Sequence, residues 1–135
     1  QQQTFREEDI LPYSLIAFYG IVNENAAKHT KMTDEDFELL KKAIWEGTRN
    51  LIITRSKFEH CPRLLLTIEH NNPGTFIGEL DKYILLETDL QEEKIRDISE
   101  VTIDFSQLYE KIKKLNCSYK IEKDERVKLK GIEIK

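Results

Sequence analysis

The residues best suited to bind a ligand are cationic and hydroxyl side chains at the end of a predicted helix. Trp45 and Arg49 lie four positions apart there, close enough for the guanidinium to lie over the indole. Hydroxyl and cationic donors hold phosphate and sugar oxygens without reading bases, so this group predicts a clamp for a nucleic-acid backbone. The alternative is a helix C-terminus whose cations stabilise its own carbonyls and dipole. The residues that follow Arg49 in this group are Thr54, Arg55, Ser56, Lys57, His60 and Arg63.

Two further groups of side chains could contact RNA. The polar segment 23–31 is predicted to be a loop, and ligand contact and ordinary solvation are equally consistent with it. Aromatic residues in the apolar run 13–22 could stack on bases, although an all-apolar strand more often buries them in a core. The loop candidates are Asn23, Asn25, Lys28 and His29, and the aromatic candidates are Tyr13, Phe18 and Tyr19.

Signatures of common enzymes and metal sites are missing from the sequence. It contains no glycine-rich phosphate loop, GxSxG elbow, HExxH motif or CxxC pair. His60, Cys61 and His70 form the only near-cluster of soft ligands, and adjacent side chains on a strand or loop point apart. We therefore predict no enzyme, no catalytic residues, no metal and no cofactor; an enzyme that uses His60 and Cys61 is the least favoured alternative.

Composition limits the class of protein. The chain has 135 residues, 39% apolar and 34% charged, which is enough for one domain. No apolar run approaches the roughly 18 residues of a membrane span, and no secretory leader opens the chain. Two cysteines fit a reduced cytosol, so we expect a soluble cytoplasmic protein without membrane contact. Because the chain starts at Gln1, we interpret residues 1–135 as one domain or a fragment of a longer protein, with a polar leader at 1–9.

Charge is distributed unevenly along the chain. Residues 1–40 carry three basic and eight acidic groups, and residues 41–63 carry six and two. Residues 64–110 then carry three basic and eleven acidic groups, and residues 111–135 carry nine and four. Screening over about 8 Å at physiological salt makes a polyanion respond mainly to nearby charge. The net charge of −4 therefore does not exclude an anion site at 41–63, although solvated faces would give the same pattern.

Hydrophobic periodicity predicts the order of elements in the first half. The nearly all-apolar residues 13–22 predict a central strand that is covered on both faces. A helix over about 34–53 is expected to start at Thr33 and to carry Phe37, Leu40, Ile44 and Leu51 on one stripe. Residues 63–68 predict a second buried strand, and the turn residues 71–74 follow it.

The second half predicts a hairpin, a helix and another hairpin. Residues 75–77 and 83–86 are the expected arms of the first hairpin, and residues 101–103 are expected to be extended. Residues 104–107 predict a cap for a helix that carries Leu108, Ile112 and Leu115 on one face. Residues 119–121 and 127–129 suggest a closing hairpin, with a bulge or a frayed tail at 130–135. This order predicts a mixed α+β fold.

Four segments in order carry a family resemblance: PYSLIAFYGIVNENAAKHT, MTDEDFELLKKAIWEGTRNLIITRSKF, CPRLLLTIEH and FIGELD. They resemble the crRNA-binding backbone subunit of type I CRISPR effector complexes, closest to the type I-B (DevR/Csh) branch of the RAMP superfamily. The resemblance runs from about Thr4 to Asp81 and continues more weakly to about Leu115. By this resemblance, the chain looks like the C-terminal half of those subunits.

The resemblance implies the C-terminal portion of an RNA-recognition-motif (ferredoxin-like) fold with a mixed or antiparallel sheet. It implies a non-catalytic, self-assembling subunit of Cascade that coats crRNA in antiviral defence. The implied partners are crRNA, copies of itself, other Cascade subunits and, through the assembled complex, target DNA. By position, the implied RNA-binding residues are Arg49, Thr54, Arg55, Ser56 and Lys57, followed by Asn23, Asn25, Lys28 and His29.

A second function stays open. The chain could be a truncated protein–protein interaction module with little RNA affinity of its own. In that case the acidic region 64–110 and the exposed strand edges would contact neighbouring subunits.

Overall fold

The described residues combine α-helices and β-strands, as predicted. The computed structural model describes residues 11–51, 53–54, 57–58 and 60–134. In this part of the chain three 3-10 turns, Leu80–Tyr83, Glu92–Lys94 and Ile98–Glu100, join the regular elements. The helices are α1 (Glu24–Thr30), α2 (Asp34–Asn50) and α3 (Ser106–Lys114), and the strands are β1 (Ile53–Thr54), β2 (Lys57–Phe58), β3 (Leu64–Glu69), β4 (Leu85–Glu87), β5 (Thr102–Asp104), β6 (Ser118–Lys123) and β7 (Lys128–Lys130).

Strand pairing is antiparallel and mixed. β3 pairs with β6 in antiparallel register from Leu64 opposite Lys123 to Glu69 opposite Ser118. β4 pairs antiparallel with β5, and β5 pairs in parallel with β7. β1 and β2 form a separate short antiparallel pair. This arrangement confirms the predicted α+β class and is compatible with a ferredoxin-like fold.

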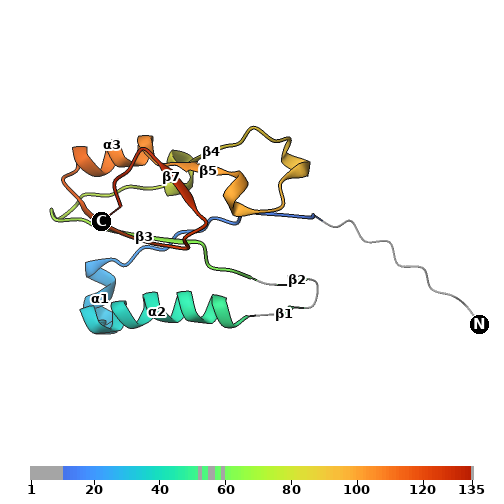
Figure 1. Ribbon diagram of the computed structural model, residues 1–135. Coiled ribbons are helices and arrows are strands. Elements are labelled where there is room, and N and C mark those ends of the chain that lie inside the picture. The colour runs from blue at the N-terminus through green and yellow to red at the C-terminus, as the bar shows by residue number, and fades with distance from the viewer. Residues whose placement is uncertain (1–10, 52, 55–56, 59, 135) are drawn as a thin grey trace, which may run out of the picture.

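The hydrophobic core lies between β3–β6 and α3. Figure 1 shows α3 and the β4–β5–β7 sheet on one side of β3, and α2 with β1–β2 on the other side. Phe105, Ile98, Leu108 and Ile112 are fully buried in this core. Burial of one such side chain contributes about 1.5–3 kcal/mol. Alternate residues of β3 pack against the same cluster, as the period of two along a strand requires: Leu64, Leu66 and Ile68.

The local signals for α3 are confirmed. The Asp104 carboxylate accepts hydrogen bonds from the backbone N–H and the hydroxyl of Ser106, at 2.8 and 2.5 Å, and so holds the start of the helix. Leu108 and Ile112 are buried as expected, and Leu115 packs partly buried against the core. Lysines in the last turn lie where the helix dipole favours cations.

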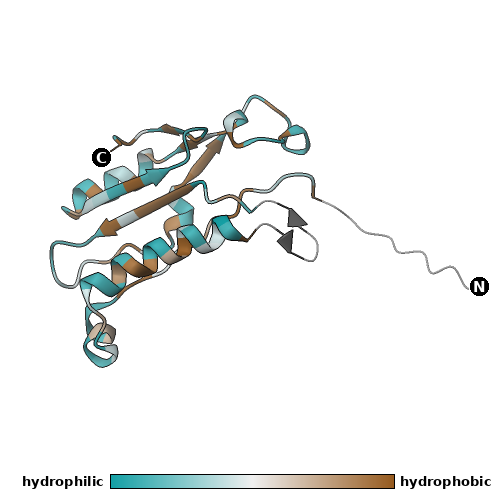
Figure 2. Ribbon diagram, turned by 60° about the horizontal axis from the view of Figure 1, so that its bottom comes forward, coloured by the Kyte–Doolittle hydropathy of each residue, from teal (hydrophilic) through white to brown (hydrophobic). Residues whose placement is uncertain are grey.

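Helix α2 begins as predicted, but its half-buried face only partly matches the predicted stripe. The Thr33 hydroxyl accepts a hydrogen bond from the Asp36 N–H, and the Asp36 carboxylate accepts one from the Thr33 N–H, which completes a capping box. Leu40 and Ile44 on the predicted stripe stay 42% and 40% exposed. Phe37, also on the predicted stripe, is half-buried as expected, and the other half-buried positions of the helix are Lys41, Trp45 and Thr48. Figure 2 shows both hydrophobic and hydrophilic residues around this helix.

The predicted strand at 13–22 is wrong. These residues contain no regular element, and Phe18 and Ile16 expose 78% and 63% of their surfaces. A strand needs a neighbour that completes its backbone hydrogen bonds, and no strand in the described residues pairs with this segment. Only its beginning is partly covered, where Leu15 packs against the core.

Both predicted hairpins are also wrong in their pairing. Residues 75–77 form no strand, and β4 pairs with β5 instead. β6 and β7 pair with β3 and β5, respectively, and not with each other. Separate pairing lets Ile121 of β6 and Val127, just before β7, both be buried. The predicted turn between β6 and β7 is present, because the Val127 N–H donates a hydrogen bond to the Asp124 carbonyl at 3.1 Å. The two strands nevertheless pair with strands that lie further away in the sequence.

Gly131 sits where the backbone takes a left-handed conformation, with φ of 79°. A Cβ there would lie 2.1 Å from the Ser106 hydroxyl, so only glycine fits beside the start of α3. The Tyr119 hydroxyl then donates a hydrogen bond to the Glu133 carbonyl at 2.8 Å.

In the part of the chain that the structure describes, no helix combines the length and apolar character needed to cross a lipid bilayer.

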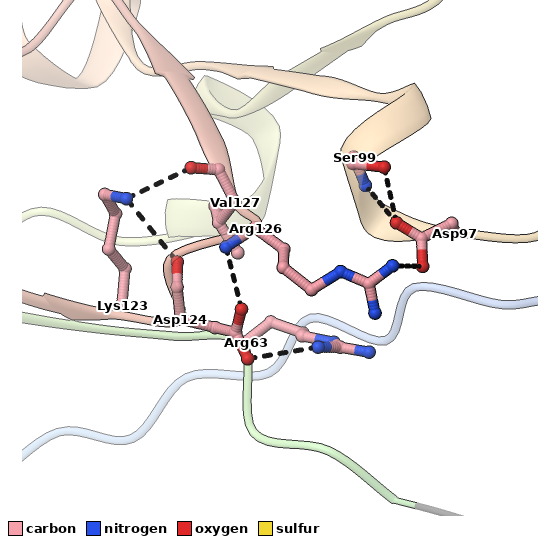
Figure 3. A network of polar contacts seen from close by, with 7 residues as sticks. All are labelled: Arg63, Asp97, Ser99, Lys123, Asp124, Arg126 and Val127. Atoms are coloured by element: carbon pink, nitrogen blue, oxygen red, sulfur yellow. Dashed lines mark hydrogen bonds and ion pairs between the residues drawn. The ribbon is translucent and has the colours of Figure 1, made fainter.

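A network of charged residues ties the β6–β7 connection to the rest of the fold (Figure 3). The Arg63 guanidinium donates to the Asp124 carboxylate at 3.1 Å, and the Asp124 N–H donates to the Arg63 carbonyl at 2.8 Å. Arg126 pairs with Asp97 at 2.5 Å, and the Asp97 carboxylate accepts from the Ser99 hydroxyl and N–H. Hydrogen bonds from Ser99, and more weakly the charge of Arg126, hold the pKa of Asp97 below its ordinary value.

Stability should therefore depend on the charge of Asp97 in acid. Because its folded pKa lies below the unfolded value of about 3.9, its stabilising effect is present above that pH and is lost as the pH falls toward the folded pKa. Asp97→Asn keeps the oxygen acceptor for Ser99 but removes the charge. We expect this variant to have a lower Tm at pH 7 and a shallower loss of Tm between pH 5 and pH 2.5 in thermal melts.

Asp89→Asn, at an exposed carboxylate, is the matched control and should leave the pH profile of Tm unchanged. Identical profiles for Asp97→Asn and the wild-type protein would contradict the role of Asp97.

Candidate nucleic-acid interface

The predicted polar loop at 23–31 is a short helix, α1, so the prediction of a loop is wrong. The Asn23 side-chain oxygen accepts hydrogen bonds from the N–H groups of Asn25 and Ala26 at 2.7 and 3.3 Å. This is the role of an N-cap, which satisfies donors that the helix itself leaves open. Lys31 ends the helix in a left-handed conformation. The oxygen of Asn23 is therefore used for structure.

Three other candidates in this segment keep their side chains in solvent. Asn25 lies in the first turn of α1, and Lys28 and His29 lie in its last turn. A cation in the last turn is favoured by the helix dipole, so stabilisation of the helix accounts for this placement as well as ligand contact does. The structure leaves Lys28 and His29 open to solvent on the surface of α1.

The second candidate group lies at the other end of α2. Arg49 is exposed in the last turn of the helix. Thr54 in β1 pairs with Lys57 in β2, so two short antiparallel strands replace part of the predicted loop. Arg55 and Ser56 lie outside the described residues.

Helix α2 separates the two candidate groups. Figure 1 shows α1 at one end of α2 and β1–β2 at the other. A helix of 17 residues is about 25 Å long. The structure therefore does not gather the predicted residues into one pocket, and a ligand that touches both groups has to be extended.

Two features that the sequence suggested for RNA binding, a free Arg63 and a contact of Arg49 with Trp45, are not found among the described residues. Arg63 is paired with Asp124 at 3.1 Å, so its charge is already neutralised within the fold. The cation–π contacts of the described residues use lysines, such as Lys41 over the Phe37 ring at 5.0 Å, and do not include Arg49 over Trp45. Trp45 instead lines a hollow that also includes Glu122 of β6, which lies 77 positions away in sequence.

The near-cluster of soft ligands is rearranged. The His70 ring nitrogen Nδ1 lies 2.9 Å from the Thr75 hydroxyl and 3.4 Å from the Cys117 sulfur. The Thr75 hydroxyl also donates to the Asn72 carbonyl at 2.8 Å, an arrangement compatible with the His70 tautomer that carries its proton on Nδ1. Burial raises the pKa of Cys117 and disfavours its thiolate. Within the described ranges, no group of three or more His, Cys, Asp or Glu side chains could hold a metal ion.

Both candidate groups lie inside a stretch that matches a known family. The family model of the CRISPR-associated protein Cas7 matches residues 1–106. The chain belongs to the Cas7 family. A Cas7 protein from Haloferax volcanii is 28% identical over 105 residues, which make up 78% of this chain and 31% of that relative. The chain thus spans about a third of the length of this curated Cas7 relative, and the resemblance to a RAMP-type CRISPR protein is confirmed at the level of the family.

The capping role of Asn23 gives a test that separates structure from ligand contact. Asn23→Ala should destabilise α1 by about 0.5–2 kcal/mol, because two backbone donors lose their acceptor. Amide hydrogen exchange across residues 24–30 should accelerate accordingly.

Asn25→Ala is the control, since that exposed side chain has no capping hydrogen bond. Equal exchange rates in Asn23→Ala and wild-type protein would show that the cap does not stabilise α1.

Proposed function

We propose that this chain contributes to a non-catalytic, RNA-binding backbone subunit of a type I CRISPR interference complex, of the I-B (DevR/Csh) branch. The observation that carries the proposal is the cationic end of α2, with Arg49 exposed beside β1–β2, inside the stretch that matches Cas7. The ligand would be crRNA, bound through its phosphates and sugars. In this proposal the protein acts in antiviral defence in the cytoplasm.

The positive charge of residues 41–63 supports RNA binding although the chain as a whole is acidic. Residues 41–63 carry six basic and two acidic groups, and four of the basic groups remain after Lys41 and Arg63 pair with carboxylates elsewhere in the fold. Charges beyond about 8 Å are largely screened at physiological salt. Contacts with phosphate and sugar carry no sequence information, which suits a protein that has to hold any guide. The bases then remain available for pairing.

The separation of the two groups supports an extended strand as the ligand. A guide that touches Arg49 and the β1–β2 pair at one end of α2 and Lys28 and His29 at the other spans about 25 Å. An extended strand can continue past each end of α2 onto another molecule. Further copies of the subunit and other Cascade subunits are therefore proposed partners, and target DNA is contacted through the assembled complex.

The salt dependence of RNA binding tests the proposed contacts. Each phosphate contact on a single strand contributes about −0.7 to the slope of log affinity against log salt concentration. We expect Arg55→Ala combined with Lys57→Ala to flatten that slope by about 1.4, measured by fluorescence anisotropy with a guide-length RNA.

The matched control removes two exposed lysines on the other side of the molecule, by Lys114→Ala combined with Lys128→Ala. This control should leave the slope unchanged. An unaltered slope in the Arg55/Lys57 variant would remove both residues from the interface.

A specific observation favours the protein–protein interaction module as a second candidate. Residues 16–22 contain no charged side chain, and Ile16, Phe18, Tyr19, Ile21 and Val22 are all exposed. Exposed contiguous apolar surface often marks a protein–protein interface. In this reading the segment binds another protein and RNA affinity is low.

Light scattering with and without a guide-length RNA distinguishes the two functions. For an RNA-binding backbone subunit, we expect the average mass to rise in steps with RNA length. For an interaction module, self-association should occur without RNA and should fall when Phe18→Lys places a charge in the apolar segment. Leu39→Lys, at an exposed apolar residue of α2, is the control for added charge alone.

A further inference from the structure

A hollow of about 200 Å³ opens between helix α2 and strand β6. Five of its residues come from α2 at spacings of three and four, which place them on one side of the helix. Glu122 on the exposed face of β6 completes the hollow. The contributions of α2 are Glu38, Lys41, Lys42, Trp45 and Glu46.

The size of the hollow suits a single side chain. Pockets for drug-sized ligands usually have about 300–1,000 Å³, so this one is too small for a whole nucleotide. At about 30 Å³ for each water molecule, it holds roughly seven waters. An arginine side chain has a similar number of non-hydrogen atoms, about seven, counting its guanidinium.

The charges that line the hollow favour a cation over a phosphate. Three glutamates and two lysines line the hollow. Lys41 and Glu38 pair with each other at 2.6 Å, which leaves two carboxylates, Glu46 and Glu122, against the single ammonium of Lys42. Among the described residues, Glu46 forms no ion pair, while Glu122 pairs at 3.2 Å with Lys120, and both residues of that pair are well exposed. Exposed pairs of this kind are weak, so the Glu122 carboxylate can exchange its partner.

Trp45 supplies the surface that selects among cations. Its half-buried indole is the only aromatic wall of the hollow. The face of an indole attracts a cation, and a planar guanidinium can stack on it while donating to carboxylates from its edge. An ammonium ion is more strongly hydrated and cannot stack.

We propose that this hollow binds the guanidinium of an arginine side chain from a protein partner, stacked on Trp45 and paired with Glu46 and Glu122. Membership in the Cas7 family implies partners among other CRISPR-associated proteins, any of which can present an arginine. The contact is independent of the proposed guide-binding residues, and it goes beyond RNA binding.

Trp45 is the only tryptophan in the chain, so its emission reports on this site alone. We would titrate the full chain with N-acetyl-arginine amide, N-acetyl-lysine amide and a uridine trinucleotide in 0.15 M salt. We expect a saturable change in emission at millimolar arginine amide, with affinity about fivefold higher than for lysine amide. The trinucleotide should cause no saturable change.

Substitution of the two carboxylates tests the geometry. Glu46→Gln combined with Glu122→Gln should weaken arginine-amide binding about tenfold, whereas Glu92→Gln combined with Glu93→Gln, at exposed carboxylates outside the hollow, should not change it. The chemical shift of the Trp45 indole N–H gives a second readout that also shows whether each variant is folded.

Three results would overturn the proposal. They are a linear, non-saturating response of wild-type Trp45 to arginine amide, equal affinity for arginine and lysine amides, and saturation by the trinucleotide with no response to arginine amide. The wild-type comparisons alone decide these outcomes, even if a carboxylate variant does not fold.

Discussion

The antiparallel pairing of β3 with β6 is the constraint on which the rest of the fold depends. It joins residues 49 to 59 positions apart and turns Leu64, Leu66 and Ile68 toward α3. Because alternate residues of a strand point to opposite faces, the same pairing fixes the outer face on which Glu122 lies near α2. Arg63, at the start of β3, and Asp124, just after β6, fasten one end of the pair by an ion pair and a backbone hydrogen bond.

The elements proposed to bind RNA lie outside this core. Helix α2 has no fully buried residue, whereas α3 buries two, so stability is concentrated on the α3 side of β3. A scaffold of this kind can present α1, α2 and the β1–β2 pair without placing them under the packing constraints of the core. The two groups proposed to contact RNA therefore lie at opposite ends of α2, about 25 Å apart, a separation that suits an extended polyanion and does not suit a compact ligand.

The uncovered apolar run at 16–22 has a different physical origin. Its residues have the composition of a strand buried on both faces, yet no described strand pairs with them. An extended backbone with unpaired groups and exposed apolar side chains gains free energy when another polypeptide covers it. This segment and the hollow at Trp45 are thus two chemically distinct surfaces proposed to bind protein partners, one apolar and one charged, alongside the proposed RNA contacts.

The sequence by itself determined the features that depend on neighbouring residues. Capping at Thr33, the start of α3 at Asp104 and the buried stripe of Leu108 and Ile112 follow from spacings within two turns of helix. Tertiary structure decided which strands pair and which residues of α2 are half-buried. It also decided that Arg63 forms an ion pair with Asp124 and that Glu122 and Trp45 line the same hollow. These outcomes depend on the relative free energies of alternative contacts between residues far apart in the sequence. A local pattern of residue types does not show which of those contacts is the most stable.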